Sequence, residues 1–216
     1  MNDFPSPLIS VEQLSDRLSD PNLVILDASY YMPAMQRDGV EEWKQRRIGC
    51  AQHFDFDQTI CEKGAEFPHT MPSPEQFEND VRALGVNTNS LLVVYAGMGM
   101  FASPRAWWMF RAMGHCNVAV LDGGLPAWDA AGLPVQTTPV EAARKGNFVA
   151  QYQPSMISNA EAVLMALQDD GACVIDVRAT GRFNGDEAEP RVGLRSGHMP
   201  GAKNLPFMNV LDNGFL

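Results

Sequence analysis

The sequence predicts an α/β fold: a central parallel sheet flanked by helices, followed by an incomplete second copy of the same arrangement. Two observations lead to this fold class. Short aliphatic runs alternate with segments of helical period along the chain, which is typical of parallel strands joined by crossover helices. Several motifs also recur after a nearly constant interval, which indicates an internal repeat.

The predicted strands are short aliphatic runs at Leu23–Asp27, Leu91–Tyr95, Val118–Leu121 and Cys173–Asp176. These runs are nearly continuous in apolar residues and do not alternate with polar ones. Continuous runs are expected where helices cover both faces of a sheet, because neither face then meets water. The sequence therefore predicts strands buried between two helical layers.

One helix is clearly marked, beginning at Ser103 and ending before Gly114. Ser103 is expected to cap the first N–H groups, Pro104 suits the first turn, and Gly114 favours a helix end. The body of the helix, Ala106 to Phe110, is apolar nearly all round, so the helix should pack directly against the sheet. We interpret its aromatic residues as core and not as a cofactor site.

Three pairs of motifs lie at similar intervals. Ile9-Ser10 matches Ile157-Ser158, Ile25–Asp27 matches Val174–Asp176, and Ile48 to Phe56 matches Met199 to Phe207, at 148, 149 or 150, and 151 residues. The stretch from Leu133 to Ser155 contains three prolines and no clear period, as linkers do. We predict a first domain at residues 6–134, a linker at 135–154 and a second domain at 155–216.

The repeat predicts which parts the second copy lacks. Partners of Leu91–Tyr95, of the loop Ala96–Phe101 and of the helix after it would lie near residues 240 to 255, beyond Leu216. We therefore expect a truncated second domain. Apolar faces and an unpaired strand edge should then promote aggregation, local disorder or dimerisation.

Composition and charge exclude several classes of protein. The chain is 45% apolar and 19% charged, which predicts a globular core. Twenty-six acidic and 16 basic residues give a net charge of −10, which disfavours nucleic acids and anionic membranes as partners. No apolar run approaches the roughly 20 residues of a membrane span, and Met1 to Ser10 lacks the features of a secretory signal, so we expect a cytoplasmic protein.

The cysteines stand at positions 50, 61, 116 and 173. Their spacing fits neither a zinc site nor a disulfide framework, so we expect separate reduced thiols.

Three motifs carry a family resemblance. The run Leu121 to Trp128 resembles D-G-G-x-x-x-W, Pro104 to Arg111 resembles the helix that precedes this signature, and Gly197 to Ala202 resembles G-H-I-P-G-A. All three are similar to motifs of the rhodanese family, and the resemblance covers residues 6 to 216. It is strongest to the tandem-domain 3-mercaptopyruvate sulfurtransferase branch.

This resemblance implies a first domain without a catalytic cysteine and a second domain with one. It implies no metal and no organic cofactor. In the family, a thiolate in a tight loop of inward-facing N–H groups accepts sulfur from a small anionic donor, 3-mercaptopyruvate or thiosulfate, and passes it to cyanide or a thiol. The one complete loop of this kind here begins with Ala96, and none of the four cysteines lies in such a loop. We therefore predict no turnover by these residues alone; the alternative is a non-catalytic rhodanese-like binding module.

Residues for substrate recognition are also implied. Asp176 to Phe183 resembles D-x-R-x-x-x-R-F, whose second arginine, here Arg182, contacts the anionic substrate, and Glu189-Pro190-Arg191 resembles the mercaptopyruvate branch through Arg191. Two guanidinium groups hold a carboxylate and a keto group better than lysines do. The alternative is that these arginines only tie down a loop, as we expect for Arg178.

Asp57 and His69 resemble the Asp and His of a relay that, in this branch, includes the serine of the cysteine loop. A carboxylate can hold an imidazole in one tautomer for proton transfer. The alternative is a solvent-facing His69 without such a role. We assign no catalytic role to His115 or His198, which lie beside glycines and are expected to anchor a helix end and a loop.

Overall fold

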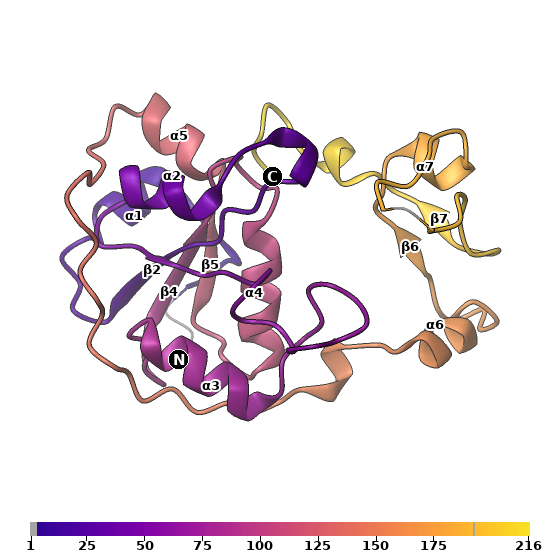
Figure 1. Cartoon of the computed structure of the whole chain (residues 1–216), viewed down its shortest axis with the longest axis horizontal. Coiled ribbons are helices and arrows are strands. Elements are labelled where there is room, and N and C mark those ends of the chain that lie inside the picture. The colour runs from indigo at the N-terminus through magenta and orange to yellow at the C-terminus, as the bar shows by residue number, and fades with distance from the viewer. Residues whose placement is uncertain (1–3, 192) are drawn as a thin grey trace. The chain divides into compact units, whose positions relative to one another are not determined.

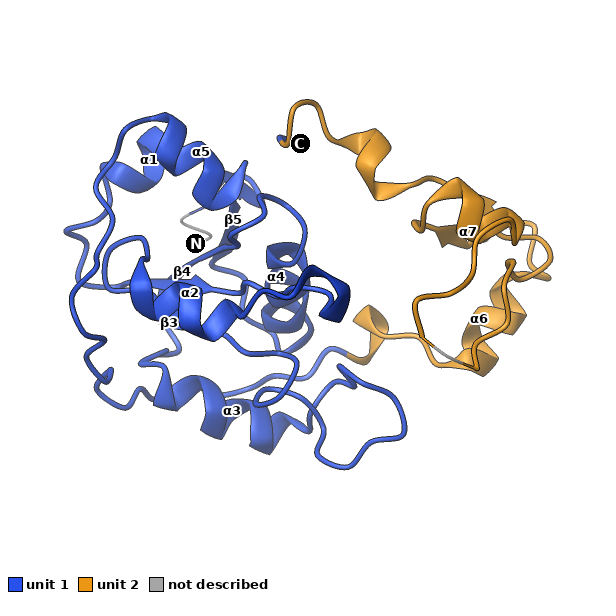
Figure 2. Ribbon diagram, turned by 45° about the horizontal axis from the view of Figure 1, so that its top comes forward, with its two compact units in different colours: residues 1–153, 215 blue, residues 154–214, 216 orange. Residues whose placement is uncertain are grey.

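The computed structural model describes residues 4–191 and 193–216 (Figure 1). The chain divides into two compact units (Figure 2). The first unit extends to Gln153 and includes Phe215; the second comprises Pro154–Gly214 and Leu216.

The first unit is built on a five-stranded sheet with strand order β1-β5-β4-β2-β3, in which every pairing is parallel. The strands are β1 (Leu8–Ile9), β2 (Leu23–Asp27), β3 (Gln52–His53), β4 (Leu91–Tyr95) and β5 (Val118–Leu121). The helices are α1 (Val11–Ser15), α2 (Gly39–Gln45), α3 (Pro74–Ala83), α4 (Ser103–Ala112) and α5 (Gly124–Ala130), with a short 3-10 turn at Pro33–Met35. The α/β fold and the predicted strands β2, β4 and β5 are confirmed.

Both faces of this sheet are buried, as the continuous apolar runs predicted. Alternate residues of β4, including Val93 and Tyr95, belong to a cluster with Leu14 of α1 and Trp128 of α5. Because successive side chains of a strand point to opposite faces, Leu92 and its alternates face the layer of α3 and α4. Figure 1 shows the two helical layers.

The second face is dominated by aromatic rings. Phe54, Phe77, Phe110 and Phe148 are each no more than 1% exposed, and their ring centroids lie 5.2 to 6.3 Å apart. Edge-to-face contacts of this kind stabilise a core beyond the area that they bury.

Helix α4 begins at Ser103, but the prediction that Ser103 caps it is wrong. The N-cap is Ala102, without a side-chain cap bond, and the buried Ser103 Oγ has no partner among the described residues. A capping residue needs an extended backbone, whereas Ala102 is helical at φ −114° and ψ −32°. The predicted end is confirmed: Gly114 has φ +83° and its N–H donates to the Arg111 carbonyl.

Residues 135–153, most of the predicted linker, pack onto the first unit; we call them the strap. Arg47, 4% exposed, donates to the Thr138 and Pro139 carbonyls. Phe148 enters the aromatic core, and the Gln151 N–H donates to Met113 at 2.8 Å. The compact unit therefore ends at residue 153 and not at 134.

The second unit contains two short strands, β6 (Ile175–Asp176) and β7 (Lys203–Asn204), paired in parallel. Its helices are α6 (Ala160–Ala166) and α7 (Thr180–Asn184), with 3-10 turns at Pro154–Met156 and Phe207–Val210. The predicted strand from Cys173 is shortened to two residues. Ile175 and Val177 are 50% and 54% exposed, because within this unit no third strand or covering helix layer is described.

The hydrogen bonds follow the predicted repeat. Asp27 Oδ1 accepts the N–H of Ser29 at 2.8 Å, and Asp176 Oδ1 accepts the N–H of Arg178 at 2.9 Å. Strand β2 pairs with β3 as β6 pairs with β7. The same kind of turn therefore occurs once in each unit, with Ser29 in the first unit at the place of Arg178 in the second.

Candidate functional site

Asp57 and His69, twelve residues apart in the connection from β3 to α3, meet directly. His69 Nε2 lies 2.6 Å from Asp57 Oδ1, and the two side chains are 17% and 30% exposed. Because an ionised carboxylate only accepts hydrogen bonds, this contact places a proton on Nε2, and in a neutral imidazole Nδ1 is then the acceptor. The geometry is that of an oriented imidazole, and His69 is not solvent-facing.

Aromatic rings and one arginine surround His69. Tyr30 and Phe56 meet its ring edge-on, with centroids 5.0 and 5.4 Å away. The Arg105 guanidinium donates to its backbone carbonyl. His69 itself adopts φ +61°, a left-handed conformation that is uncommon for a residue with a side chain.

In the second unit, Arg182 is held by Glu189. Arg182 Nη2 lies 2.5 Å from Glu189 Oε2, and the Glu189 side chain is only 5% exposed. The same carboxylate lies 2.7 Å from Arg178 Nη1, and Arg178 also pairs with Asp176 and donates to Gly197. Hydrogen bonding by Arg182 holds the pKa of Glu189 below its ordinary value, and Arg178 is paired within its own domain as predicted.

Arg191 is exposed at the end of the same segment. Across residues 4–191 and 193–216, its side chain has no recorded ion pair or hydrogen bond, and the structure does not join it to Arg182. The two arginines therefore differ: Arg182 is already half of an ion pair, while Arg191 presents its charge to solvent.

The loop after β4, residues Ala96 to Phe101, is closed by its own neighbours. The Gly97 N–H donates to Ser29 Oγ at 2.8 Å, and Ser29 Oγ donates in turn to the buried Asp27. A side chain at Gly97 would collide with the Tyr31 hydroxyl. The Gly97 amide is thus already bonded to Ser29. The residue before it, where a nucleophile would stand, is Ala96.

The four cysteines lie elsewhere. Cys61 is buried, its thiol donates to the Asp57 carbonyl at 3.1 Å, and burial raises its pKa. The other three, Cys50, Cys116 and Cys173, are exposed. A raised pKa lowers the thiolate fraction at neutral pH, so Cys61 is poorly suited to be a nucleophile.

His115 and His198 serve as anchors, as expected. His115, 6% exposed, bonds the Ser90 carbonyl at 2.9 Å. His198 bonds the Phe183 carbonyl at 2.7 Å and stacks on the Phe183 ring at 3.7 Å.

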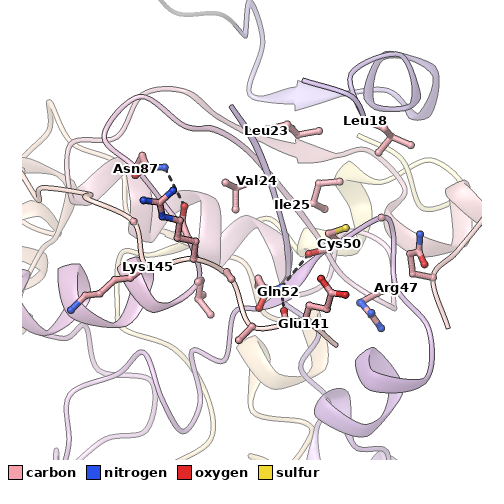
Figure 3. Close-up of a pocket in the computed structure, with 18 of the residues that line it drawn as sticks. Leu18, Leu23, Val24, Ile25, Arg47, Cys50, Gln52, Asn87, Glu141 and Lys145 are labelled. Carbon is pink, nitrogen blue, oxygen red and sulfur yellow. Dashed lines mark hydrogen bonds between the residues drawn. The ribbon is translucent and has the colours of Figure 1, made fainter. Parts of the chain in front are cut away.

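Two clefts open on the first unit. The larger, of about 1020 Å³, lies beneath the strap near the amino ends of β2, β3 and β4, with Leu23, Ile25, Cys50, Arg47 and Glu141 in its lining (Figure 3). It contains none of the predicted site residues. The smaller, of about 420 Å³, lies at the carboxyl ends of the strands and includes Gly97, the edge where α/β sheets usually bind ligands.

The side chains lining the smaller cleft bond one another. Tyr31 donates to Glu42 at 2.6 Å, Arg37 pairs with Glu42 at 2.6 Å, and Arg46 pairs with Asp129 at 2.6 Å. Across the described residues there is no cluster of three or more His, Cys, Asp or Glu side chains suited to a metal ion. Within the same residues, no helix has the length and apolar character of a membrane span.

Comparison with known proteins decides the family. Residues 10–131, more than half of the chain, match the family model of the rhodanese-like domain. The chain belongs to the rhodanese family. Its resemblance to the tandem rhodaneses and its fold class are thereby confirmed.

Curated rhodanese relatives are sulfurtransferases. The chain is 37% identical to thiosulfate/3-mercaptopyruvate sulfurtransferase 1 of Arabidopsis thaliana over 96% of its own length and 60% of that protein. It is 38% identical to the 3-mercaptopyruvate sulfurtransferase of Rattus norvegicus, covering 95% of this chain and 71% of the relative. The chain therefore spans about three fifths of the Arabidopsis protein and somewhat more of the rat protein.

Solved structures match the fold of this chain. The crystal structure of the 3-mercaptopyruvate sulfotransferase SseA from Escherichia coli matches with a TM-score of 0.87 at 33% identity, over 98% of this chain and 79% of that one. The crystal structure of the Tum1 protein from Saccharomyces cerevisiae matches with a TM-score of 0.86 at 30% identity, over 95% and 71%.

Sequence reasoning did not identify Glu189 as the partner of Arg182, or Arg105 as a neighbour of His69. A signal existed for Glu189, because an acid seven residues after an arginine in a loop can fold back on it. No local signal marks Arg105, because 36 residues separate it from His69.

Proposed function

We propose that the chain belongs to the machinery that moves sulfur from 3-mercaptopyruvate, or thiosulfate, to cyanide or a thiol through a cysteine persulfide. Support comes from the sulfurtransferase names of relatives at 37% and 38% identity and from the arginines of the second unit. We also propose that these 216 residues alone do not catalyse the sulfur transfer, since no cysteine lies in a loop that could carry the persulfide.

In the proposed reaction with mercaptopyruvate, atoms and electrons balance without a cofactor. A cysteine thiolate attacks the sulfur of the donor, a new S–S bond forms, and the C–S bond breaks with its electron pair passing to carbon. The thiol proton of the donor moves to that carbon, which gives pyruvate. An acceptor thiolate or cyanide then attacks the outer sulfur and restores the cysteine thiolate.

In this proposal Arg182 and Arg191 recognise the carboxylate and keto oxygens of the donor. Arg182 uses Nε and Nη2 toward Glu189, so among the described residues its Nη1 remains for an anion, and the exposed Arg191 supplies a second positive group. Paired guanidinium groups suit a planar carboxylate. Asp57 and His69 supply an oriented imidazole for the proton that moves.

The observation that carries the inactivity is the loop after β4. It begins with Ala96, and its Gly97 N–H is bonded to Ser29. A persulfide needs both a thiolate and amides directed toward it, because the amides lower the thiol pKa. This loop has no thiol, and the amide next to Ala96 is already bonded to Ser29.

Pyruvate release tests the proposal. The purified chain is incubated with 3-mercaptopyruvate and cyanide, and pyruvate is followed with a coupled dehydrogenase; an intact rhodanese relative is the positive control. We expect no release above the buffer rate and no persulfide on any cysteine by mass spectrometry. Release at a rate comparable with the control, or a persulfide on any of the four thiols, refutes the inactivity.

A second candidate, an anion-binding module without turnover, is favoured by the exposed Arg191, which lies in the same unit as the paired Arg182. Titration with pyruvate as the probe, followed by NMR, tests whether the two arginines bind an anion, as both candidates require. Shifts at both arginines that Arg191→Gln abolishes support donor recognition. Saturable binding unaffected by Arg191→Gln would point to an anion site elsewhere.

A further inference from the structure

Arg105 is an arginine in an unfavourable place. It is half-buried in the first turn of α4, where the helix dipole presents its positive end and disfavours a cation. Among the described residues it has no ion-pair partner, and its buried Nε has no hydrogen-bond acceptor. Burial lowers its pKa, which is the expected response of a cation withdrawn from water without a counter-charge.

His69, the residue that Arg105 bonds, is also held unfavourably. Its φ of +61° places a residue with a side chain in a left-handed conformation, which persists only when surrounding contacts impose it. Two unfavourable features therefore meet at one hydrogen bond, between the Arg105 guanidinium and the His69 carbonyl.

The contacts around this bond form one continuous group. The Arg105 guanidinium lies over the rings of Phe56, at 5.5 Å, and Trp108, at 5.6 Å. Phe56 in turn meets the His69 ring edge-on at 5.4 Å. The guanidinium thus contacts the backbone of His69 directly and also contacts Phe56, which packs against the His69 ring.

We propose that Arg105 is a positioning residue for His69: its guanidinium fixes the left-handed backbone that aims the imidazole at Asp57. The inference rests on the proposed proton-transfer role of the Asp57–His69 pair. Arginine suits this task, since a planar guanidinium donates in its plane while stacking on an aromatic face. A lysine ammonium can donate but cannot stack in the same way.

The test compares stability with the order of the His69 ring in the full chain. Arg105→Met keeps an unbranched side chain between Phe56 and Trp108 but removes the charge and the donor. Arg111→Met is the matched control, because Arg111 stacks on Trp107 of the same helix at 5.8 Å and has no recorded contact with His69. Stability is measured by urea unfolding, and the Nε2–H of His69 by solvent exchange in ¹⁵N-histidine NMR spectra.

We expect Arg105→Met to unfold at the same or a higher urea concentration than the wild type, because an unpaired buried cation is removed. We expect the His69 Nε2–H to exchange about tenfold faster, the effect of losing one ordinary hydrogen bond in a local equilibrium. Arg105→Lys should give an intermediate exchange rate, and Arg111→Met should leave the rate unchanged.

Opposite results overturn the inference. If Arg105→Met lowers the unfolding midpoint well below that of Arg111→Met, or fails to fold, Arg105 is structural support and not a positioning residue. Unchanged exchange of the His69 Nε2–H in Arg105→Met refutes it equally. If the wild type itself shows no protected Nε2–H, the proposed role of the Asp57–His69 pair fails, irrespective of Arg105.

Discussion

Replacing Phe148 by alanine should unfold the first unit more easily, although the residue lies in a segment that reads as a linker. Phe148 is 1% exposed, and its ring lies 5.8 Å from Phe77, 6.1 Å from Phe110 and 5.7 Å from His115. Removing a buried phenylalanine ring leaves a cavity and costs about 3–5 kcal/mol. With an m-value of about 2 kcal/mol/M, the urea midpoint should fall by about 1.5–2.5 M.

Two further variants sharpen this measurement. Phe148→Leu keeps most of the apolar volume and should cost only about 1–1.5 kcal/mol. Val149→Ala, at a neighbouring residue that is 51% exposed, should stay within about 0.5 kcal/mol of the wild type. Hydrogen exchange should also accelerate in Phe148→Ala at Gly146 and Gln151, whose amides anchor the strap.

A small effect would refute this reasoning. If Phe148→Ala costs less than about 1 kcal/mol, or if Val149→Ala costs as much, the strap is peripheral. The first unit would then end near residue 134, where the sequence places the boundary.

Other expectations concern pH and thiol chemistry. Because Arg182 lowers the pKa of Glu189, their ion pair should stabilise the second unit at neutral pH and be lost as the pH falls through that lowered value; the Arg182 Nε–H signal should broaden over the same fall in pH. Burial raises the pKa of Asp27, so the first unit should lose stability as the pH rises from about 4 through that raised value. Asp27→Asn, which keeps an acceptor for the Ser29 N–H, should flatten the dependence in urea titrations, and an unchanged slope would contradict the assignment. Timed alkylation with mass spectrometry should modify the three exposed cysteines at neutral pH well before Cys61, whose burial and raised pKa protect it; equal rates would contradict this order.

The sheet of the first unit was predictable because its strands are dense in aliphatic residues. Leu91–Tyr95 is buried at every position, and no other local structure hides five successive apolar side chains so simply. The repeat was predictable for a related reason, since Asp27 and Asp176 direct the same turn. Patterns of this kind depend on neighbours in sequence.

Features that depend on distant neighbours were missed. Ser103 has the residue type of a cap, but the tertiary course of the preceding loop gives Ala102 a helical backbone. The prolines in and beside the strap suggest a free linker, yet a single aromatic side chain, Phe148, packs it into the core. The Arg182–Glu189 ion pair and the hydrogen bond from Arg105 to the His69 carbonyl arise from tertiary packing. The spacing of residues in the sequence does not predict them.

The hydrogen bond from Gly97 to Ser29 has a consequence for protein engineering. Replacing Ala96 by cysteine would introduce a sulfur atom into the turn. The Gly97 amide beside it would still donate to the Ser29 hydroxyl, which itself donates to Asp27. A new thiol there would also be buried, because Ala96 is only 1% exposed, and burial in apolar surroundings keeps a thiol protonated. Redesign of this domain as a sulfur carrier therefore has to begin at position 29, one strand away from the loop that it is meant to change.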